Sequence, residues 1–155
     1  MDTKSYKSKI SLTQISKIES LIENICQEHN ISCYYGVIVV SIEQILDLIN
    51  TYYGNISNNK VISFYFEQCV GGISFSIECE DEIFSQLVFG KDIEMEEDSN
   101  LSVFLISKLS DQVIITEGGK RIEILFFVNG IQPELLIDRQ EKIKQFNLVR
   151  MHQNI

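Results

Sequence analysis

Two alternating runs of apolar and polar residues, each interrupted by a Gly-Gly pair, constrain the fold of this chain more than any other feature. The runs are KVISFYFEQCVGGISFSIECE, residues 60–80, and DQVIITEGGKRIEILFFV, residues 111–128. Strict alternation is typical of half-buried strands, and a glycine pair between two such runs favours a tight hairpin turn. The sequence therefore predicts two β-hairpins, each with one buried face.

The position of each glycine pair also predicts a register. A two-residue turn at Gly71 and Gly72 would pair Val70 with Ile73, and further along it would pair Phe66 with Ile77. The residues expected on the core face of the first hairpin are Phe64, Phe66, Val70, Ile73, Phe75, Ile77 and Cys79. Tyr65 and Cys69 are expected on the opposite face, so Cys69 and Cys79 should not form a disulfide.

The equivalent turn in the second hairpin pairs Glu117 with Lys120, a cross-strand pair of opposite charge. The residues that this register places on the core face are Val113, Ile115, Ile122, Ile124 and Phe126.

Two helices are expected before the hairpins. Ser11 and Gln14 have the spacing of a capping box at the start of the first helix, which should end near His29. Apolar residues then recur at three- and four-residue steps through a second helix from about Tyr35 to Tyr53, although VIVV within it also suits a strand. Gly54 and the residue after it can end this helix.

Between the hairpins, an acidic stretch at residues 91–98 is long for a connection and is expected to be a loop, a mobile segment or a docking surface for a basic partner. A short helix follows, with Ser99 or Asn100 as its cap. Pro133 stands where a final helix would begin.

This order predicts an α+β fold, a two-layer α/β sandwich in which a mixed or antiparallel sheet of two hairpins carries helices on one face. We expect one such domain over residues 8–130, with a C-terminal helical extension over residues 131–155 packed on it.

A net charge of −9 and an isoelectric point near 4.7 limit the classes of partner. Proteins that follow nucleic-acid phosphates or bind anionic membranes carry clustered Lys and Arg. No apolar run approaches the roughly 18 residues of a membrane span, and the first residues lack a signal-peptide pattern. We expect a cytoplasmic protein with no nucleic-acid or membrane partner. Four cysteines without C-x-x-C spacing favour free thiols and no metal centre.

Glu43 and Asp47 lie one turn apart on the polar side of the second helix. Two carboxylates at this spacing can be a solvated helix face, or they can be a general base and a metal ligand. The spacing leaves both interpretations open.

The order of elements, together with Glu43, Asp47 and Asp81, resembles the histidine-kinase and gyrase type of ATP-binding domain. Within that superfamily the chain is similar to the short anti-sigma regulatory kinases, over roughly residues 11–128. In the family the second helix carries a Glu that acts as general base and, four residues later, an Asn that binds magnesium. A D-x-G-x-G motif follows the first hairpin, and its Asp receives the adenine amino group.

The resemblance implies that Glu43 is the general base, that Asp47 is the magnesium ligand and that Asp81 contacts adenine. It also implies nucleotide contacts from Asn100 and Lys108, because SNLSVFLISKLSDQV matches the glycine-rich stretch and short helix of the family.

Several residues depart from the family pattern. Ile83 and Ser85 stand where the two glycines of D-x-G-x-G belong, and they narrow the place where adenine would lie. The acidic stretch would face a triphosphate with only Lys91 nearby to offset its charge.

Three functions are therefore weighed. The first is a diverged anti-sigma-factor-like regulatory protein that binds a protein partner, such as a sigma factor or an anti-anti-sigma-like protein, and has weakened or lost nucleotide binding. The second is an active serine kinase that binds Mg-ATP. The third is a structural module that forms a homodimer through its last helix. The first predicts no bound cofactor, and the second predicts ATP and magnesium.

Overall fold

A five-stranded antiparallel sheet organises the structure, a computed structural model that describes residues 5–54, 60–69, 71–94, 100–128 and 141–145. The elements in chain order are β1 (Ser5–Ser11), α1 (Ile15–Glu28), a 3-10 turn (Ser32–Tyr34), α2 (Tyr35–Tyr53), β2 (Val61–Cys69), β3 (Gly72–Glu78), α3 (Leu101–Leu109), β4 (Gln112–Thr116), a second 3-10 turn (Glu117–Gly119) and β5 (Arg121–Phe126). The strand order in the sheet is β1-β2-β3-β5-β4. The predicted α+β class is confirmed, and the sheet is antiparallel.

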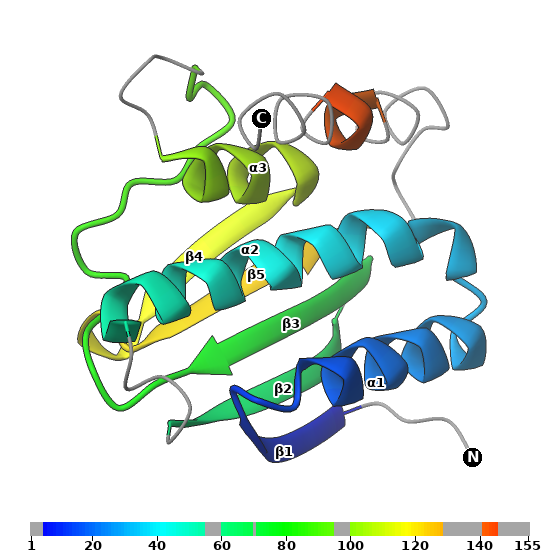
Figure 1. Cartoon of the computed structure of the whole chain (residues 1–155). Helices are drawn as coiled ribbons and strands as arrows, with labels where there is room; N and C mark the ends of the chain where they lie inside the picture. The colour runs from blue at the N-terminus through cyan, green and yellow to red at the C-terminus, as the bar shows by residue number, and fades with distance from the viewer. Residues whose placement is uncertain (1–4, 55–59, 70, 95–99, 129–140, 146–155) are drawn as a thin grey trace, which may run out of the picture.

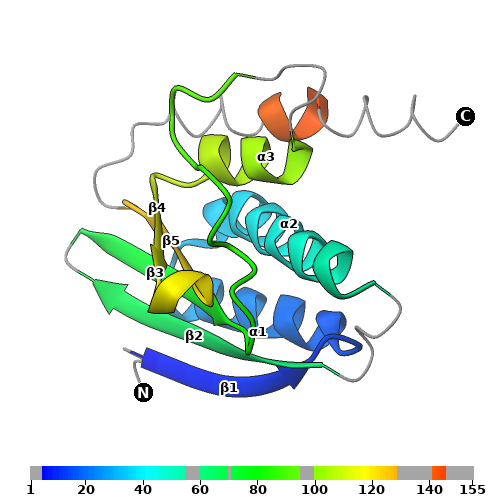
Figure 2. The same cartoon turned by 90° about the vertical axis from the view of Figure 1, so that its left-hand side faces the viewer.

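The helices α1, α2 and α3 lie on one face of this sheet, as Figures 1 and 2 show. The central helix α2 lies between α1 and α3 and runs roughly along the direction of the strands (Figure 1). The apolar side chains between the two layers are almost fully buried; they include Phe64, Phe66, Phe75 and Phe126 from the sheet and Ile38, Ile42, Ile45 and Ile49 from α2. Helices therefore cover one face of the sheet, as the sequence predicts.

The register of the first hairpin differs from the prediction by two residues. Cys69 pairs with Gly72, and Phe66 lies opposite Phe75 rather than Ile77. Gly72 belongs to β3 instead of the turn, because a Cβ atom there would lie only 2.1 Å from the backbone oxygen of Phe126 on the neighbouring strand. The glycine is needed for this close approach of two strands.

A two-residue slip leaves every side chain on its predicted face. Phe64, Phe66, Ile73, Phe75 and Ile77 are buried on the helix side. Cys79 is also buried, Tyr65 and Cys69 are half-buried on the other face, and Val70 is outside the described residues. All four cysteines are free thiols, as predicted.

The second hairpin has the predicted register. Thr116 pairs with Arg121, and the backbone N–H of Lys120 donates to the oxygen of Glu117 at 3.3 Å. Ile122, Ile124 and Phe126 are fully buried, whereas Val113 and Ile115 on the edge strand β4 are half-buried.

The two long helices agree with their predicted limits. The helix α2 spans Tyr35–Tyr53 and ends at Gly54, which has a φ of 61°. The helix α1 ends at Glu28, with His29 as its C-cap. The predicted capping by Ser11 is wrong, because α1 begins at Ile15 with Gln14 as its N-cap and no side-chain cap; the backbone N–H of Ser11 donates to Oε1 of Gln14 at 3.4 Å ahead of the helix.

The strand β1 is missing from the prediction. Ser11, expected as a helix cap, is the last residue of this edge strand, which pairs with β2. Its outward side chains Lys7 and Lys9 are exposed, and Ile10 is the one fully buried residue in the strand. Lysines on an edge strand discourage pairing with other chains. Because β1 has few apolar residues, it lacks the clear apolar alternation that predicts a strand.

The window Ser32–Tyr53, which includes α2, is long and apolar enough to cross a membrane by length and composition. Within the fold 56% of it is buried, which is how the core helix of a globular domain meets the same criterion.

The predicted final helix and the division at residue 130 fall largely outside the described residues. Residues 141–145 are helical, and Ile143 packs against the core.

Phe75 should contribute strongly to stability, because its ring is fully buried and lies 5.3 Å from Phe66 and 6.4 Å from Phe126, centroid to centroid. We expect Phe75→Ala to lower the free energy of unfolding by about 3 to 5 kcal/mol in urea titrations. The matched control Phe127→Ala removes a ring that is 39% exposed and should cost about 1 kcal/mol or less. Equal losses in the two variants would contradict this description of the core.

Candidate functional site

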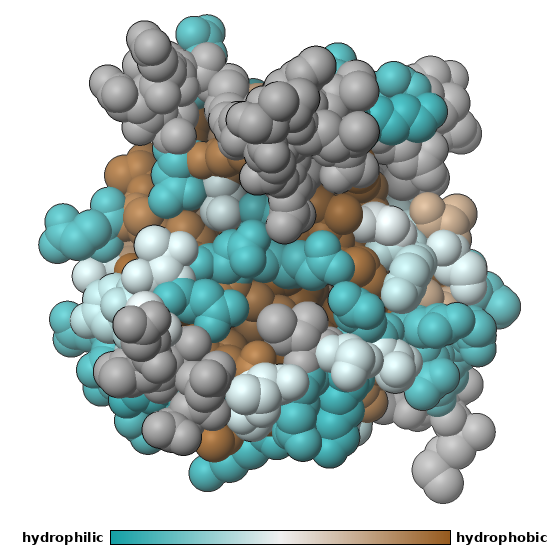
Figure 3. Space-filling view, viewed as in Figure 1, coloured by the Kyte–Doolittle hydropathy of each residue, from teal (hydrophilic) through white to brown (hydrophobic). Residues whose placement is uncertain are grey.

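The carboxylates Glu43 and Asp47 lie on the side of α2 that faces away from the sheet. Glu43 is half-buried and Asp47 is exposed, whereas Ile45 and Leu46 between them are buried, as is the preceding Ile42. Figure 3 shows hydrophilic residues in a band over α2, with apolar atoms on both sides of the band. The predicted pair is therefore accessible from the helix side of the molecule.

Asp81 lies beside the last turn of α2, the helix that also carries Glu43, although the two residues are far apart in sequence. The hydroxyl of Tyr53, the last residue of α2, donates to Oδ2 of Asp81 at 2.8 Å. Tyr53 follows Asp47 by six residues and Glu43 by ten, which corresponds to an axial rise of about 9 Å and about 15 Å. Along α2 the order is thus Asp81, Asp47, Glu43.

The environment of Tyr53 keeps its hydroxyl protonated. Burial, the hydrogen bond to Asp81 and the negative charge of Asp81 all raise the pKa of Tyr53 above its ordinary value. The ammonium of Lys60 lies 4.8 Å from the centre of the tyrosine ring. Tyr53 is therefore a hydrogen-bond donor to Asp81 at neutral pH, and the sequence analysis names it only as the end of the second helix.

The loop after β3 holds Asp81 against the turn of the second hairpin. The backbone N–H of Cys79 donates to the oxygen of Lys120, and that of Phe84 donates to the oxygen of Gly119, each at 2.9 Å. A Cβ atom at Gly119, where φ is 99°, would lie 2.5 Å from that of Ser85. These contacts require the glycine and fix the loop.

Of the two positions where the resembled family has glycines, one holds a packed side chain and the other an exposed serine. Ile83 is 8% exposed, and its neighbour Phe84 is fully buried in the core. Ser85 is exposed, and its hydroxyl donates to the backbone oxygen of Glu82 at 3.0 Å. The loop is thus anchored by apolar burial, where a glycine-rich loop would offer its bare backbone to a ligand.

Asn100 is the N-cap of α3, one of its two predicted caps. Its Oδ1 accepts from the backbone N–H of Val103 at 3.1 Å. Two residues further along, in the first turn of α3, the hydroxyl of Ser102 donates to Oε1 of the buried Gln44 of α2 at 2.9 Å. The side chain assigned to the nucleotide is therefore engaged in holding α3, which packs directly on α2.

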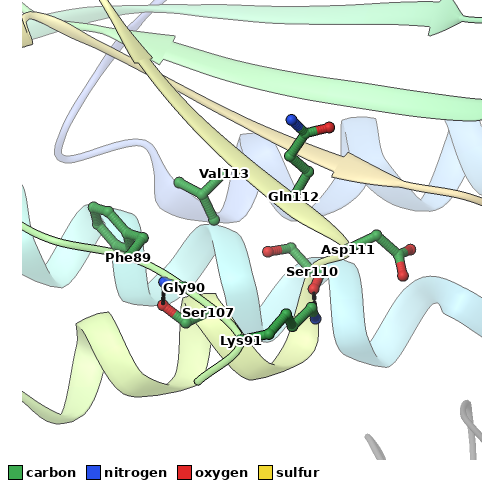
Figure 4. Close-up of a pocket in the computed structure, with 8 residues that line it drawn as sticks. All are labelled: Phe89, Gly90, Lys91, Ser107, Ser110, Asp111, Gln112 and Val113. Atoms are coloured by element: carbon green, nitrogen blue, oxygen red, sulfur yellow. Dashed lines mark hydrogen bonds between the residues drawn. The ribbon is translucent and has the colours of Figure 1, made fainter. Parts of the chain in front are cut away.

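Lys108 and Lys91 join the loop around Gly90 to the end of α3, and Figure 4 shows the Lys91 side of this contact. Lys108 donates through Nζ to the backbone oxygen of Lys91, and Lys91 donates in return to the backbone oxygens of Lys108 and Ser110. The backbone N–H of Gly90 also donates to the hydroxyl of Ser107 at 3.1 Å. Cations are favourable at a helix C-terminus, where backbone carbonyls lack partners.

The loop at residues 89–91, the end of α3 and the start of β4 line a cavity of about 210 Å³. Figure 4 shows Lys91 reaching toward Ser110 across the cavity from Asp111 and Gln112. Lys91, expected to offset the charge of the acidic stretch, donates to the backbone oxygens of Lys108 and Ser110 at the end of α3. Residues 95–98 of the acidic stretch are outside the described part of the chain.

Among the described residues, no group of three or more His, Cys, Asp or Glu side chains could hold a metal ion together. Asp47, the expected magnesium ligand, belongs to no such group within the described ranges.

No protein-family model matches the chain, and no curated protein matches its sequence. The site is therefore interpreted from its geometry.

Removal of the Tyr53 hydroxyl should weaken the contact between α2 and the β3 loop. Hydrogen bonds to charged groups are worth more than neutral ones, and this one is partly buried, so we expect Tyr53→Phe to lower the free energy of unfolding by about 1 to 2 kcal/mol. The control is Tyr52→Phe, because Tyr52 is 57% exposed. This variant should have the same free energy of unfolding as the wild type. Equal effects of the two variants in urea titrations would refute the bond.

The same bond makes a prediction for alkaline pH. Because the pKa of Tyr53 is raised in the folded state, the unfolded chain loses this proton first, and stability falls as pH rises above the ordinary tyrosine value of 10.0. Tyr53→Phe lacks the group, so the difference in unfolding free energy between wild type and variant should narrow from pH 8 to above pH 10. A constant difference across that range would contradict the raised pKa.

Proposed function

We propose that this chain is a diverged relative of the anti-sigma regulatory kinases that acts by binding a protein partner, with weakened or lost nucleotide binding. The observation that carries the proposal is the 2.8 Å hydrogen bond from Tyr53 to Asp81. The carboxylate of Asp81, which would receive the adenine amino group, already accepts a hydrogen bond from Tyr53 of the same chain.

Three further contacts support the same conclusion. Ile83 is packed where a glycine would leave room for the base. Asn100 caps α3, and Lys108 binds the backbone of the loop. A ligand that needed Oδ1 of Asn100 or the N–H group of Lys108 already in use would compete with the hydrogen bonds that these atoms make, which costs part of the binding energy.

The observed chain order supports the family resemblance itself. Two helices, a hairpin, a loop, a short helix and a second hairpin follow each other as expected, with β1 added before them. The proposed partner is a regulatory protein such as a sigma factor or an anti-anti-sigma-like protein, and the proposed location is the cytoplasm.

One observation favours the active kinase as a second candidate. Along the axis of α2 the three carboxylates lie in the order Asp81, Asp47, Glu43. This is the order in which adenine, a phosphate-bound magnesium and a general base would lie along one ATP molecule. The dimerisation module depends on residues 131–155, of which the structure describes 141–145, and it stays a hypothesis.

Thermal melting with and without Mg-ATP separates the two candidates. A ligand present at 100 times its dissociation constant adds about 2.7 kcal/mol, which raises the melting temperature of a domain of this size by roughly 5 to 11 °C. We expect the wild type to shift by less than about 1 °C at millimolar Mg-ATP. A shift of the larger size that Asp81→Asn abolishes would overturn the proposal in favour of the kinase.

A further inference from the structure

The face of the sheet opposite the helices carries no described element, and its side chains form a hollow of about 320 Å³. The sheet hollow is lined by residues that include Lys7, Tyr65, Glu67, Ser74, Ser76 and Arg121. It forms because the middle of β3 carries two short side chains on this face, Ser74 and Ser76, while the flanking strands carry the long side chains of Tyr65, Glu67 and Arg121. Ser74 and Ser76 are the floor, and the longer residues are the walls.

Two cations meet one aromatic ring at the wall of the sheet hollow. The guanidinium carbon of Arg121 lies 4.3 Å from the centre of the Tyr65 ring, and Nζ of Lys7 lies 5.3 Å from the same centre. Such stacking orients a guanidinium and leaves its in-plane N–H groups free to donate. Within the described ranges, neither cation makes an ion pair.

The floor contains a buried hydroxyl, that of Ser74, for which the described part of the chain offers no hydrogen-bond partner. Ser74 is 5% exposed, and its hydroxyl makes no hydrogen bond to any described residue. Its neighbour Ser76, which is 2% exposed, donates to Oε2 of Glu123 at 3.4 Å. Buried polar groups are nearly always bonded, so an unpartnered hydroxyl that lines a hollow indicates a group that arrives from outside.

The charges around the sheet hollow restrict that group. Arg121 and Lys7 attract an anion, and a guanidinium fork matches a planar carboxylate. Three carboxylates nearby oppose a second negative charge: Glu67 lines the hollow, Glu78 accepts from the Tyr65 hydroxyl at 3.5 Å, and Glu123 accepts from Ser76. These two cations and three carboxylates sum to −1, so the surroundings oppose a monoanion less than a doubly charged phosphate, and the attraction comes from direct contact with Arg121 and Lys7.

We propose that the sheet hollow binds the carboxylate group of a small molecule, with Arg121 and Lys7 as the cationic contacts and the Ser74 hydroxyl as a third donor. The site lies on the opposite face of the sheet from Glu43 and Asp47 and does not rest on the proposed function. Its volume is at the lower end of the range for small-molecule sites, so the ligand is small.

Sodium acetate is the probe, titrated into the ¹⁵N-labelled full chain at constant ionic strength and pH 7, with inorganic phosphate in a parallel titration. We expect saturable shifts of the Ser74 and Ser76 amides and of the Arg121 Nε–H signal with acetate. Arg121→Gln should weaken the fitted affinity about tenfold, because a charge-assisted hydrogen bond is lost. The control Lys120→Gln makes the same charge change at the exposed residue before Arg121 and should leave the affinity unchanged.

Ser74→Ala separates a ligand contact from a structural role. Because the hydroxyl has no described partner, the variant should melt at the wild-type temperature or above it while its acetate affinity falls severalfold. Unsaturable shifts, equal affinities of Arg121→Gln and Lys120→Gln, or tighter binding of phosphate than of acetate would each overturn the proposal. The Mg-ATP melting result is independent of all three.

Discussion

The packing of α2 against the phenylalanine side chains of the sheet is the interaction on which the remaining structure depends. The helix is 19 residues long, about 28 Å, and presents Ile38, Ile42, Ile45 and Ile49 to the sheet along one stripe. Phe66 and Phe75 from adjacent strands lie 5.3 Å apart beneath it. Because this interface fixes the direction of α2 over the strands, it also fixes where both ends of the helix meet the loops.

Several polar contacts follow from that placement. The C-terminal end of α2 reaches the loop after β3, where Tyr53 binds Asp81. One flank of the helix receives α3, and the buried Gln44 finds its partner in Ser102. A buried amide without such a partner would cost free energy, so these contacts stabilise the position of both α3 and the β3 loop.

Local patterns in the sequence were sufficient where one interaction dominates. The limits of α2 follow from its apolar period and Gly54, and the register of the second hairpin follows from Gly118 and Gly119, both of which have positive φ in the turn. The first hairpin contains the same Gly-Gly pair, yet Gly72 is needed because the backbone of β5 passes close to it, and not for the turn. The requirement for glycine at this position comes from Phe126, which is 54 residues further along the chain. A local sequence pattern therefore cannot reveal it.

The candidate site was harder to predict for the same reason. Glu43, Asp47 and Asp81 could be named from their spacing and their place in the chain order. The role of Tyr53 required knowledge that the end of α2 meets a loop 28 residues later. The unbonded hydroxyl of Ser74 likewise depends on the side chains of β2 and β5, which flank its strand.

The two faces of the sheet differ in the cost of binding a ligand. On the helix side, Asp81, Asn100 and Lys108 each have an intramolecular partner, so a ligand there replaces bonds that already exist. On the open side, Arg121 makes no described ion pair and Ser74 no described side-chain hydrogen bond, so a ligand there adds bonds. Since the net value of a hydrogen bond depends on what the donor loses, the open face is the more favourable surface for a small anion.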